Sequence, residues 1–302
     1  MILSVSRRTD VPKLYSEWLI NRLAAGYCVV RNPMNHAMLS RIPLTPDVVD
    51  CIVFWTKDPE PMLARLDEID AMGYPYYFQF TLTPYGTDLE RNLRPKREII
   101  DTFIRLSGKI GRERVVWRYD PIVLNDSYTL ARHEKLFLRL CELLSPYTDT
   151  VVISFVDLYK KLNSPLVLEI SEAEIMTLAG FIGETARRFG LRAVTCSEAA
   201  DLSRFGIGRS SCIDKARIER ILGCRIDAKP DKNQRSGCGC IESIDIGAYD
   251  TCTNGCLYCY ANRSIAAAAR NFAVHDPSGE LLFGKIGEGE IIRERAVRRM
   301  RG

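Results

Sequence analysis

The segment Tyr76-Tyr-Phe-Gln-Phe-Thr-Leu82 is followed by an amphipathic stretch at residues 96–110 and then by Val115-Val-Trp-Arg-Tyr119. Both flanking runs are rich in aromatic and β-branched residues, which predicts strands, and the stretch between them has the spacing of a helix. A strand–helix–strand unit of this kind joins two parallel strands. The segment therefore predicts a parallel sheet with helices packed against it.

The same alternation extends in both directions from this unit. Further strands are expected at Ile2–Ser6, Tyr27–Val30, Cys51–Trp55, Thr150–Phe155 and Arg192–Thr195. Helices are expected near residues 12–25, 59–71, 128–144 and 172–189, and Ser171-Glu-Ala-Glu174 has the spacing of a capping box. This many units in one chain predicts an α/β fold, a (β/α) TIM-like barrel over residues 1–240.

A short array of cysteines follows this region. The chain reads Asp250-Thr-Cys-Thr-Asn-Gly-Cys-Leu-Tyr-Cys-Tyr-Ala-Asn262, which gives the pattern Cys-x-x-x-Cys-x-x-Cys. Three thiolates at this spacing can hold three irons of a 4Fe-4S cluster and leave the fourth iron open to bind and reduce S-adenosylmethionine. The array therefore predicts a radical-SAM cluster held by Cys252, Cys256 and Cys259, with Tyr258, Tyr260 and Asn262 beside the cofactor.

Two other uses of these thiols stay open. Structural zinc takes four ligands, so it would need a fourth partner, for which His275, Cys238 or Cys240 could serve. Unliganded thiols are the second alternative. An aromatic residue before the last cysteine, here Tyr258, is frequent in radical-SAM loops and favours iron–sulfur.

The last strand of the expected barrel has two candidates, Ser243–Gly247 and Cys224–Asp227. We favour Ser243–Gly247, because radical-SAM proteins place the cysteine loop directly after a strand and before a helix, for which Asn262–Phe272 is the candidate. This unit usually comes first in the chain, whereas here it comes last. The order predicts a circularly permuted barrel, with residues 241–302 packed as the cluster loop and helix of the same domain.

Polar residues follow most of the expected strands, and active sites of (β/α) barrels lie at the carboxyl ends of their strands. The strand ends read Arg7-Arg8-Thr9-Asp10, Arg31-Asn32-Pro33, Thr56-Lys57-Asp58, Thr81 to Thr83, Arg118-Tyr119-Asp120, Asp157 and Cys196-Ser-Glu198. Guanidinium, ammonium and carboxylate groups can clamp S-adenosylmethionine and a polar second substrate. The candidates for substrate binding and proton transfer are Arg7, Asp10, Lys57, Arg118, Asp120 and Glu198.

Four further thiols suggest a second metal site. Cys196, Cys212, Cys238 and Cys240 would suffice for an auxiliary iron–sulfur cluster or zinc, and Gly237 and Gly239 would let the last pair turn tightly. If Ser243–Gly247 is a strand, however, Cys238 and Cys240 should lie at the opposite end of the barrel from Cys196, unless the chain makes a long excursion over the carboxyl ends of the strands. Free thiols, or Cys196 alone as a hydrogen-atom donor, are the alternatives.

Composition narrows the class of protein. The chain has eleven cysteines, an odd number, and no export signal at its start, which favours a reducing cytoplasm and metal over disulfides. No apolar run is long enough to span a membrane. The net charge of the chain is +4. The last ten residues, with five arginines and one glutamate, also carry +4, so the rest of the chain is formally neutral. A neutral body counts against a nucleic-acid partner, and we expect the tail to be a solvated, partly helical end.

Motifs along the whole chain resemble one known family. They are Ser4-Val-Ser-Arg-Arg-Thr-Asp-Val-Pro12, Arg31-Asn-Pro33, Asp50-Cys-Ile-Val-Phe-Trp-Thr-Lys57, Gln79-Phe-Thr-Leu-Thr-Pro-Tyr-Gly86, Trp117-Arg-Tyr-Asp-Pro121, Ile153-Ser-Phe-Val-Asp-Leu-Tyr159 and Asp245-Ile-Gly-Ala-Tyr249. With these motifs the chain resembles domain-of-unknown-function family 1848. The resemblance implies a carboxyl-terminal cysteine cluster like that of radical-SAM enzymes and leaves the reaction open.

The sequence thus predicts a radical-SAM enzyme of unknown substrate, reduced by a one-electron donor of flavodoxin or ferredoxin type. Two rivals remain. A non-enzymatic iron–sulfur or zinc metalloprotein would explain the cysteines but not the charged strand ends. A radical enzyme similar to DNA-repair lyases would explain a local likeness of the cysteine loop, but the neutral body does not favour it.

Overall fold

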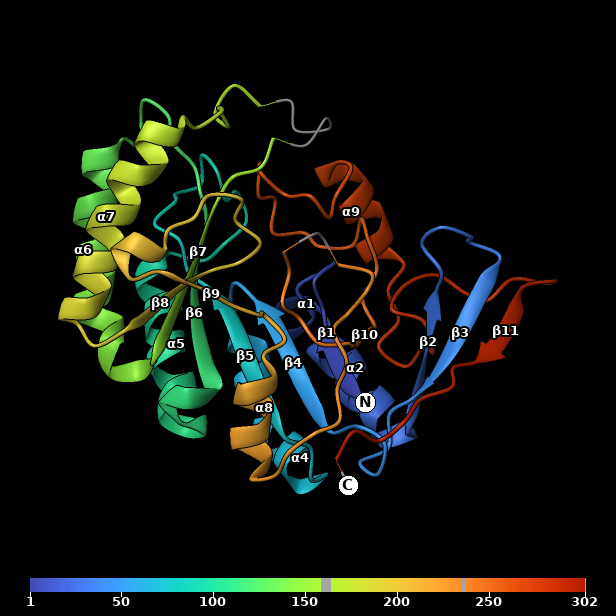
Figure 1. The fold of residues 1–302 in the computed structure, drawn as a ribbon. Coiled ribbons are helices and arrows are strands. Elements are labelled where there is room, and N and C mark those ends of the chain that lie inside the picture. Colours follow the sequence, from blue (N-terminus) through green and yellow to red (C-terminus); the bar gives the residue numbers. More distant parts are fainter. Residues whose placement is uncertain (159–163, 235–236, 302) are drawn as a thin grey trace.

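The computed structural model describes residues 1–158, 164–234 and 237–301. Its centre is an eight-stranded parallel sheet with the order β10-β1-β4-β5-β6-β7-β8-β9 (Figure 1). Its strands are β1 (Ile2–Val5), β4 (Cys51–Thr56), β5 (Tyr76–Thr81), β6 (Val115–Ile122), β7 (Thr150–Phe155), β8 (Arg192–Thr195), β9 (Gly208–Arg209) and β10 (Ile244–Asp245). A parallel sheet flanked by helices agrees with the α/β class that the strand–helix alternation predicts.

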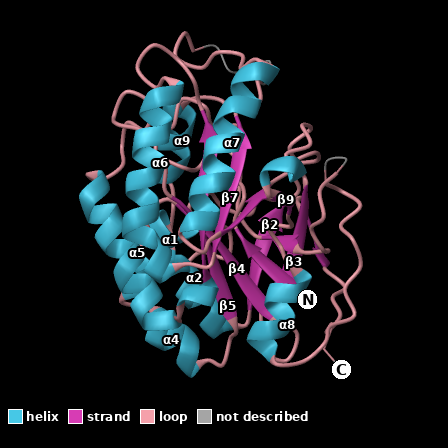
Figure 2. Ribbon diagram, turned by 60° about the vertical axis from the view of Figure 1, so that its left-hand side comes forward, coloured by secondary structure: helices cyan, strands magenta, loops and turns pink. Residues whose placement is uncertain are grey.

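Most helices cover one face of the sheet, whereas α8 lies on the other face (Figure 2). The α-helices are α1 (Val11–Leu14), α2 (Ser16–Ala25), α3 (Glu60–Leu63), α4 (Leu66–Ala71), α5 (Lys96–Ile110), α6 (Leu130–Leu144), α7 (Glu172–Arg188), α8 (Lys215–Leu222) and α9 (Ile265–Ala273). Short 3-10 turns lie at Arg112–Arg114, Ser145–Tyr147 and Ser203–Phe205. The amphipathic stretch at residues 96–110 coincides with α5, and the capping box at Ser171 starts α7 as predicted.

The two faces of the sheet differ in character. Side chains such as Phe54, Phe78 and Trp117 point toward the helices and form the largest apolar cluster. On the opposite face, an apolar layer comes first along the strands: Ile2, Val53, Tyr77, Val116, Val152 and Val194. Two residues further along each strand the side chains are Ser4, Trp55, Gln79, Arg118, Ser154 and Cys196. Because strand side chains alternate between faces, this second layer lies on the same face, which turns polar toward the carboxyl ends of the strands.

One expected strand belongs elsewhere. Tyr27–Val30 is a strand, but β2 (Tyr27–Arg31) pairs with β3 (Met38–Pro43) in a separate sheet, whose third strand is β11 (Ile291–Glu294). Arg31 there binds Glu290 and not the main sheet. The expectation that Arg31 follows a strand of the main sheet was therefore wrong.

The edges of the main sheet are β10 and β9. The favoured candidate Ser243–Gly247 contains β10, which runs parallel to β1 with Ser4 opposite Asp245. In the other candidate, Cys224–Asp227, the structure has a single bridge from Ile226 to Arg301. Within the described residues no pairing joins β9 to β10. The sheet is therefore parallel, and closure into a barrel is not shown.

Most of the arginine-rich tail is exposed, in agreement with the expected solvated end, but its described residues are not helical and its last residues are docked. After β11 it has no regular secondary structure, and there Arg298 pairs with Asp227 at 2.8 Å and Arg301 with Asp50 at 3.2 Å. The backbone amide of Met300 also donates to Asp50, at 2.8 Å. Among the described helices, none has both the length and the apolar composition needed to cross a bilayer.

Candidate functional site

The cysteine loop begins where β10 ends, and Asp245 attaches this point to β1. Its carboxylate accepts hydrogen bonds from the Ser4 and Ser6 hydroxyls at 2.9 and 2.5 Å and from the backbone amide of Arg7 at 2.9 Å. Gly247 then passes so close to β1 that an added Cβ would lie 2.0 Å from the Ser6 hydroxyl. The loop is thereby held at the carboxyl end of β1.

A second segment, residues 89–92, supports the loop from the other side. The backbone amide of Leu257 donates to Leu89 at 2.9 Å, and that of Asn92 donates to Asn254 at 3.1 Å. Gly255 has a φ of +70°, and a Cβ there would lie 3.0 Å from the Asn92 side chain. The close approach and the positive φ explain why glycine stands between the first two cysteines of the array.

The three thiols of the array are half-buried and lie on one short loop. Burial raises the pKa of Cys252 to about 12 and raises that of Cys256 well above its usual range, although Lys57 acts in the opposite direction on Cys256. Within the described residues, no three His, Cys, Asp or Glu side chains are arranged as a metal-holding group. The donor set itself, three sulfurs on one loop, has the chemistry that iron–sulfur clusters use.

Lys57, at the end of β4, is linked to the cysteine loop through Glu90. Its ammonium group donates to Glu90 at 2.8 Å and to the Tyr258 hydroxyl at 2.9 Å, and Lys96 pairs with the same carboxylate. Burial raises the pKa of Glu90, but Lys57 and Lys96 outweigh burial and lower it to about 2. Burial likewise lowers the pKa of Lys57, and the Glu90 charge reverses the shift and raises it. Lys57 therefore carries a positive charge beside Cys256.

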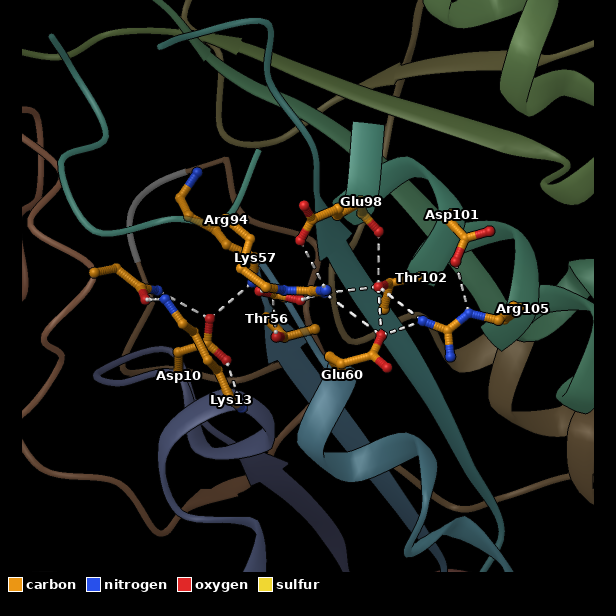
Figure 3. Close-up of polar contacts among 12 residues, drawn as sticks. Asp10, Lys13, Thr56, Lys57, Glu60, Arg94, Glu98, Asp101, Thr102 and Arg105 are labelled. Atoms are coloured by element: carbon orange, nitrogen blue, oxygen red, sulfur yellow. Dashed lines mark hydrogen bonds and ion pairs between the residues drawn. The ribbon is translucent and has the colours of Figure 1, made fainter. Parts of the chain in front are cut away.

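Asp10 joins β1, β4 and the cysteine loop. It accepts hydrogen bonds from the backbone amides of Lys57 at 2.8 Å and Lys13 at 3.2 Å and from the Asn254 side chain at 3.0 Å. Figure 3 shows Asp10 between Lys13 and Lys57, with a separate network of Arg94, Glu60, Thr102 and Arg105 beyond them. The Asp10 carboxylate thus caps α1 and links β4 to the cysteine loop. These contacts favour a positioning role over proton transfer.

Arg118 and Asp120 lie on β6 and form a buried pair. Arg118 donates to the Asp120 carboxylate at 3.0 Å through Nε, and its Nη1 contacts Gln79 at 3.2 Å. The guanidinium groups of Arg118 and Arg7 both lie over the Trp55 ring, 5.3 and 5.5 Å from its centroid. The structure therefore brings Arg7, Arg118 and Asp120 to one face of the sheet, around an indole.

Glu198 follows β8, and both its carboxylate oxygens are used by the backbone. One accepts from the amide of Phe155 and the other from Ala199, each at 3.1 Å. It therefore connects the ends of β7 and β8.

Three buried polar atoms near the cysteine loop have no hydrogen-bond partner within the described residues: Arg7 Nε, Thr9 Oγ1 and Asn262 Oδ1. The first two follow β1. Asn262 follows the last cysteine of the array, and its amide nitrogen donates to the Cys252 carbonyl at 2.6 Å. Tyr260, between Cys259 and Asn262, donates its hydroxyl to the Arg7 carbonyl at 2.7 Å. Buried polar groups are nearly always paired, so these atoms are exceptions. Three further exceptions, Arg22 Nε, Tyr76 Oη and Arg301 Nε, lie elsewhere in the described residues.

The four remaining predicted thiols are not separated as the strand order suggested. Cys196 Sγ lies 2.8 Å from Cys212 Sγ, and the Cys212 thiol is also the largest influence on Cys240, whose pKa it lowers. Cys238 packs against the same apolar cluster as these three. The separation of Cys240 from Cys196 that strand order suggests is not found, and the alternative of a long excursion fits better, because residues 210–234 and 237–243 pack on the face of the sheet. His275, a candidate zinc ligand, bonds instead to the Leu282 carbonyl at 2.6 Å.

Several residues of the site had not been singled out from the sequence. Glu90 lies in a loop without periodicity, and Lys96 is the first residue of the expected helix, so neither was marked as part of a site. Trp55 was assigned to a strand, and alternation along that strand could have placed it on the same face as Ser4. Asn254 stands in an Asn-Gly pair between two cysteines, which is a turn signal.

A family model described as "Domain of unknown function (DUF1848)" matches residues 2–261. The chain belongs to this family. The match extends from β1 to the end of the cysteine array, which confirms the resemblance drawn from the motifs. Among curated proteins none matches the chain. A solved structure titled "putative alpha-L-fucosidase" from Bacteroides thetaiotaomicron VPI-5482 matches 58% of this chain and 74% of its own at 9% identity, with a TM-score of 0.26, which is too low to support an argument.

Proposed function

We propose that this member of the DUF1848 family is a radical S-adenosylmethionine enzyme of unknown substrate. The observation that carries the proposal is the group of unpartnered buried atoms, Arg7 Nε, Thr9 Oγ1 and Asn262 Oδ1, beside a three-cysteine loop. A purely structural metal would need the cysteines but no unfilled polar contacts next to them. S-adenosylmethionine offers an amine, a carboxylate and hydroxyls that could satisfy such atoms.

Cys252, Cys256 and Cys259 would hold a 4Fe-4S cluster, and the residues present suit that group. The three sulfurs lie on one loop, and the positive charge of Lys57 opposes part of the upward shift that burial gives the pKa of the Cys256 thiol. When bound, the cluster would supply the electron that cleaves S-adenosylmethionine reductively to a deoxyadenosyl radical.

The roles of the neighbouring residues follow from their contacts. Asn262 and Arg7 would bind the cofactor with their unpartnered atoms, while Tyr260 fixes the backbone between them. Tyr258 holds the loop against Glu90 and Lys57. Arg118 and Asp120 would face a polar substrate, and Glu198 would keep the ends of β7 and β8 in place.

The finer fold is part of the same proposal. A cysteine loop placed between β10 and α9, with β10 beside β1, is the order expected of a circularly permuted (β/α) barrel. In this arrangement β10, the last strand of the main sheet in the chain, occupies the position beside β1 that the first strand holds in the usual chain order. We propose a cytoplasmic enzyme served by a flavodoxin- or ferredoxin-type donor.

The test is reconstitution of the full chain with iron and sulfide in the absence of oxygen. We expect about four irons at the cysteine loop, an electron-paramagnetic signal that changes on addition of S-adenosylmethionine, and formation of deoxyadenosine. Cys256→Ala should abolish deoxyadenosine formation. The matched control is Cys224→Ala, since Cys224 is exposed.

Two outcomes would contradict the enzyme. The first is stoichiometric zinc without iron in protein purified anaerobically, which would support a structural metalloprotein. The second is an intact cluster whose signal does not respond to S-adenosylmethionine. Asn262→Ala refines the test, because loss of a polar contact typically costs about 1–3 kcal/mol and should weaken cofactor binding without loss of iron.

A further inference from the structure

Residues 210–234 and 237–243, between β9 and β10, pack against the face of the sheet opposite the large helical layer. Residues Ile213, Ile218, Ile226 and Ile241 of this segment pack with the apolar layer of the strands. Tyr77 and Gln79 of β5 both donate to the carbonyl of Cys212, each at 2.7 Å. The segment is therefore anchored to the sheet at the position of Cys212.

This anchoring gathers thiols that are distant in the sequence. Cys196 comes from the end of β8, Cys212 from the start of the segment, and Cys240 from its end. The sulfurs of Cys196 and Cys212 are 2.8 Å apart, and Cys212 and Cys240 are almost fully buried. Cys238 is half-buried and packs against the same cluster.

Two of the sulfurs receive N–H groups from the protein. Arg118 Nη1 lies 3.0 Å from the Cys212 sulfur, and the backbone amide of Ile213 donates to the Cys240 sulfur at 3.4 Å. Donors aimed at sulfur stabilise the thiolate, the form of cysteine that binds metals. The charge of the guanidinium group would offset part of the negative charge of several thiolates in a buried place.

The turn that carries the last two cysteines is built for close approach. Gly239 stands between them, and a Cβ at this position would lie 2.6 Å from the Ser211 hydroxyl, which donates to the Gly239 carbonyl. Gly237, immediately before the pair, has a φ of +81°. A side chain at Gly239 would clash with Ser211, and one at Gly237 would strain the backbone, so both glycines support this turn.

We propose that Cys196, Cys212 and Cys240, with Cys238 as the fourth thiol, form a second metal–thiolate centre on this face of the sheet. The centre holds zinc or an iron–sulfur cluster, and both require the same four thiolates. In this structure these four residues are not arranged around a metal. Two thiolates on one zinc stand roughly 3.8 Å apart, so Cys196, which is half-buried in a loop, needs to turn outward by about 1 Å.

A disulfide between Cys196 and Cys212 is the competing interpretation of the 2.8 Å contact. A disulfide would not explain why the Cys240 sulfur lies in the same cluster and accepts a hydrogen bond from the Ile213 amide. It would also leave the Arg118 guanidinium against a neutral sulfur in a place where only 6% of that residue is exposed. The donors to two different sulfurs therefore favour the metal over the disulfide.

The experiment uses the full-length chain with Cys252, Cys256 and Cys259 all replaced by Ser, so that metal at the cysteine loop does not contribute. After anaerobic purification, metals and sulfide are counted per chain. About four irons with sulfide would identify an iron–sulfur cluster, and about one zinc a zinc site. Adding Cys212→Ser should remove this metal, whereas Cys224→Ser should leave it unchanged.

The same count in the otherwise intact protein, with and without Cys212→Ser, covers the case in which the triple variant does not fold. A metal content that Cys212→Ser does not lower would overturn the second centre, and so would a Cys196–Cys212 disulfide detected by mass in anaerobic protein. In the triple variant the count is made without the three thiols of the cysteine loop, and in the intact protein it is the loss caused by Cys212→Ser that is measured. Neither count uses an assay of turnover, so both are independent of the proposed radical chemistry.

Discussion

The two thiol-bearing regions of the molecule are assembled in opposite ways. Cys252, Cys256 and Cys259 lie on one turn, so their association is visible in the sequence. Cys196 and Cys212 meet only because a long segment returns across the sheet. The first region depends on local spacing and the second on the tertiary fold, so the second should be more sensitive to changes in the core.

Their electrostatic surroundings differ as well. The cysteine loop faces Lys57 and Lys96, whose charges are balanced by Glu90 in a buried network. The second set of thiols faces Arg118, which is already paired with Asp120. A change in either network should therefore affect one thiol region and spare the other.

Glu90→Gln should have the largest effect, because it leaves Lys57 and Lys96 close together without a counter-charge. Breaking a buried ion pair by removing one partner typically costs about 3–5 kcal/mol, and the Glu90 side chain is fully buried. Urea denaturation should show a decrease of this size in the free energy of unfolding. Glu68→Gln is the control, since Glu68 forms an exposed pair with Arg65. A loss as small as that of the control would mean that the network does not hold the loop.

Arg118→Lys should have a smaller and more selective effect. Lysine keeps the charge beside Asp120 but cannot reproduce the two-pronged contact or reach the Cys212 sulfur in the same geometry. Loss of such an outer contact typically lowers metal affinity roughly 10–100-fold. Competition with a chelator should show this decrease at the second thiol set, with iron at the cysteine loop unchanged. Equal losses at both sites would show that Arg118 acts through overall folding.

Much of the main sheet could be predicted because its strands are buried on both faces and read as continuous apolar runs. The misplaced strand, Tyr27–Val30, has the same apolar character, and nothing in its own residues marks it as part of a smaller sheet. The short strand β9, Gly208–Arg209, has too few residues to form a pattern. Pairing partners are decided by contacts distant in sequence, which periodicity does not report.

The residues of the candidate site also fall into those that local sequence predicts and those placed by distant contacts. The cysteine array and the residues after each strand could be named in advance, because spacing and the parallel-sheet rule need only local information. Glu90 could not, since its importance comes from two lysines that converge on it from β4 and α5. The position of Cys240 was left open between two alternatives, because strand direction alone does not show whether a segment crosses back over the sheet.

The smallest predicted effect is a pH dependence on the cysteine-loop side of the molecule. His133 is buried in α6, with Nδ1 2.7 Å from the Tyr119 hydroxyl and Nε2 2.9 Å from the Val123 carbonyl. It also packs edge-on against Tyr85, which in turn contacts Tyr258 of the loop. Burial lowers the pKa of His133 below its ordinary value of 6.5, and the Val123 carbonyl only partly opposes this.

The sign of the effect follows from proton uptake. As the pH falls through 6.5, the unfolded chain binds a proton at His133 that the folded chain does not, so the free energy of unfolding decreases until the lower folded pKa is reached. We expect the melting temperature to fall between neutral and mildly acidic pH. This fall should be shallower in His133→Gln than in the control His36→Gln, where an exposed histidine is replaced. Equal slopes in the two variants would show that His133 takes up its proton without unfolding, and that the aromatic contacts under the cysteine loop tolerate the charge.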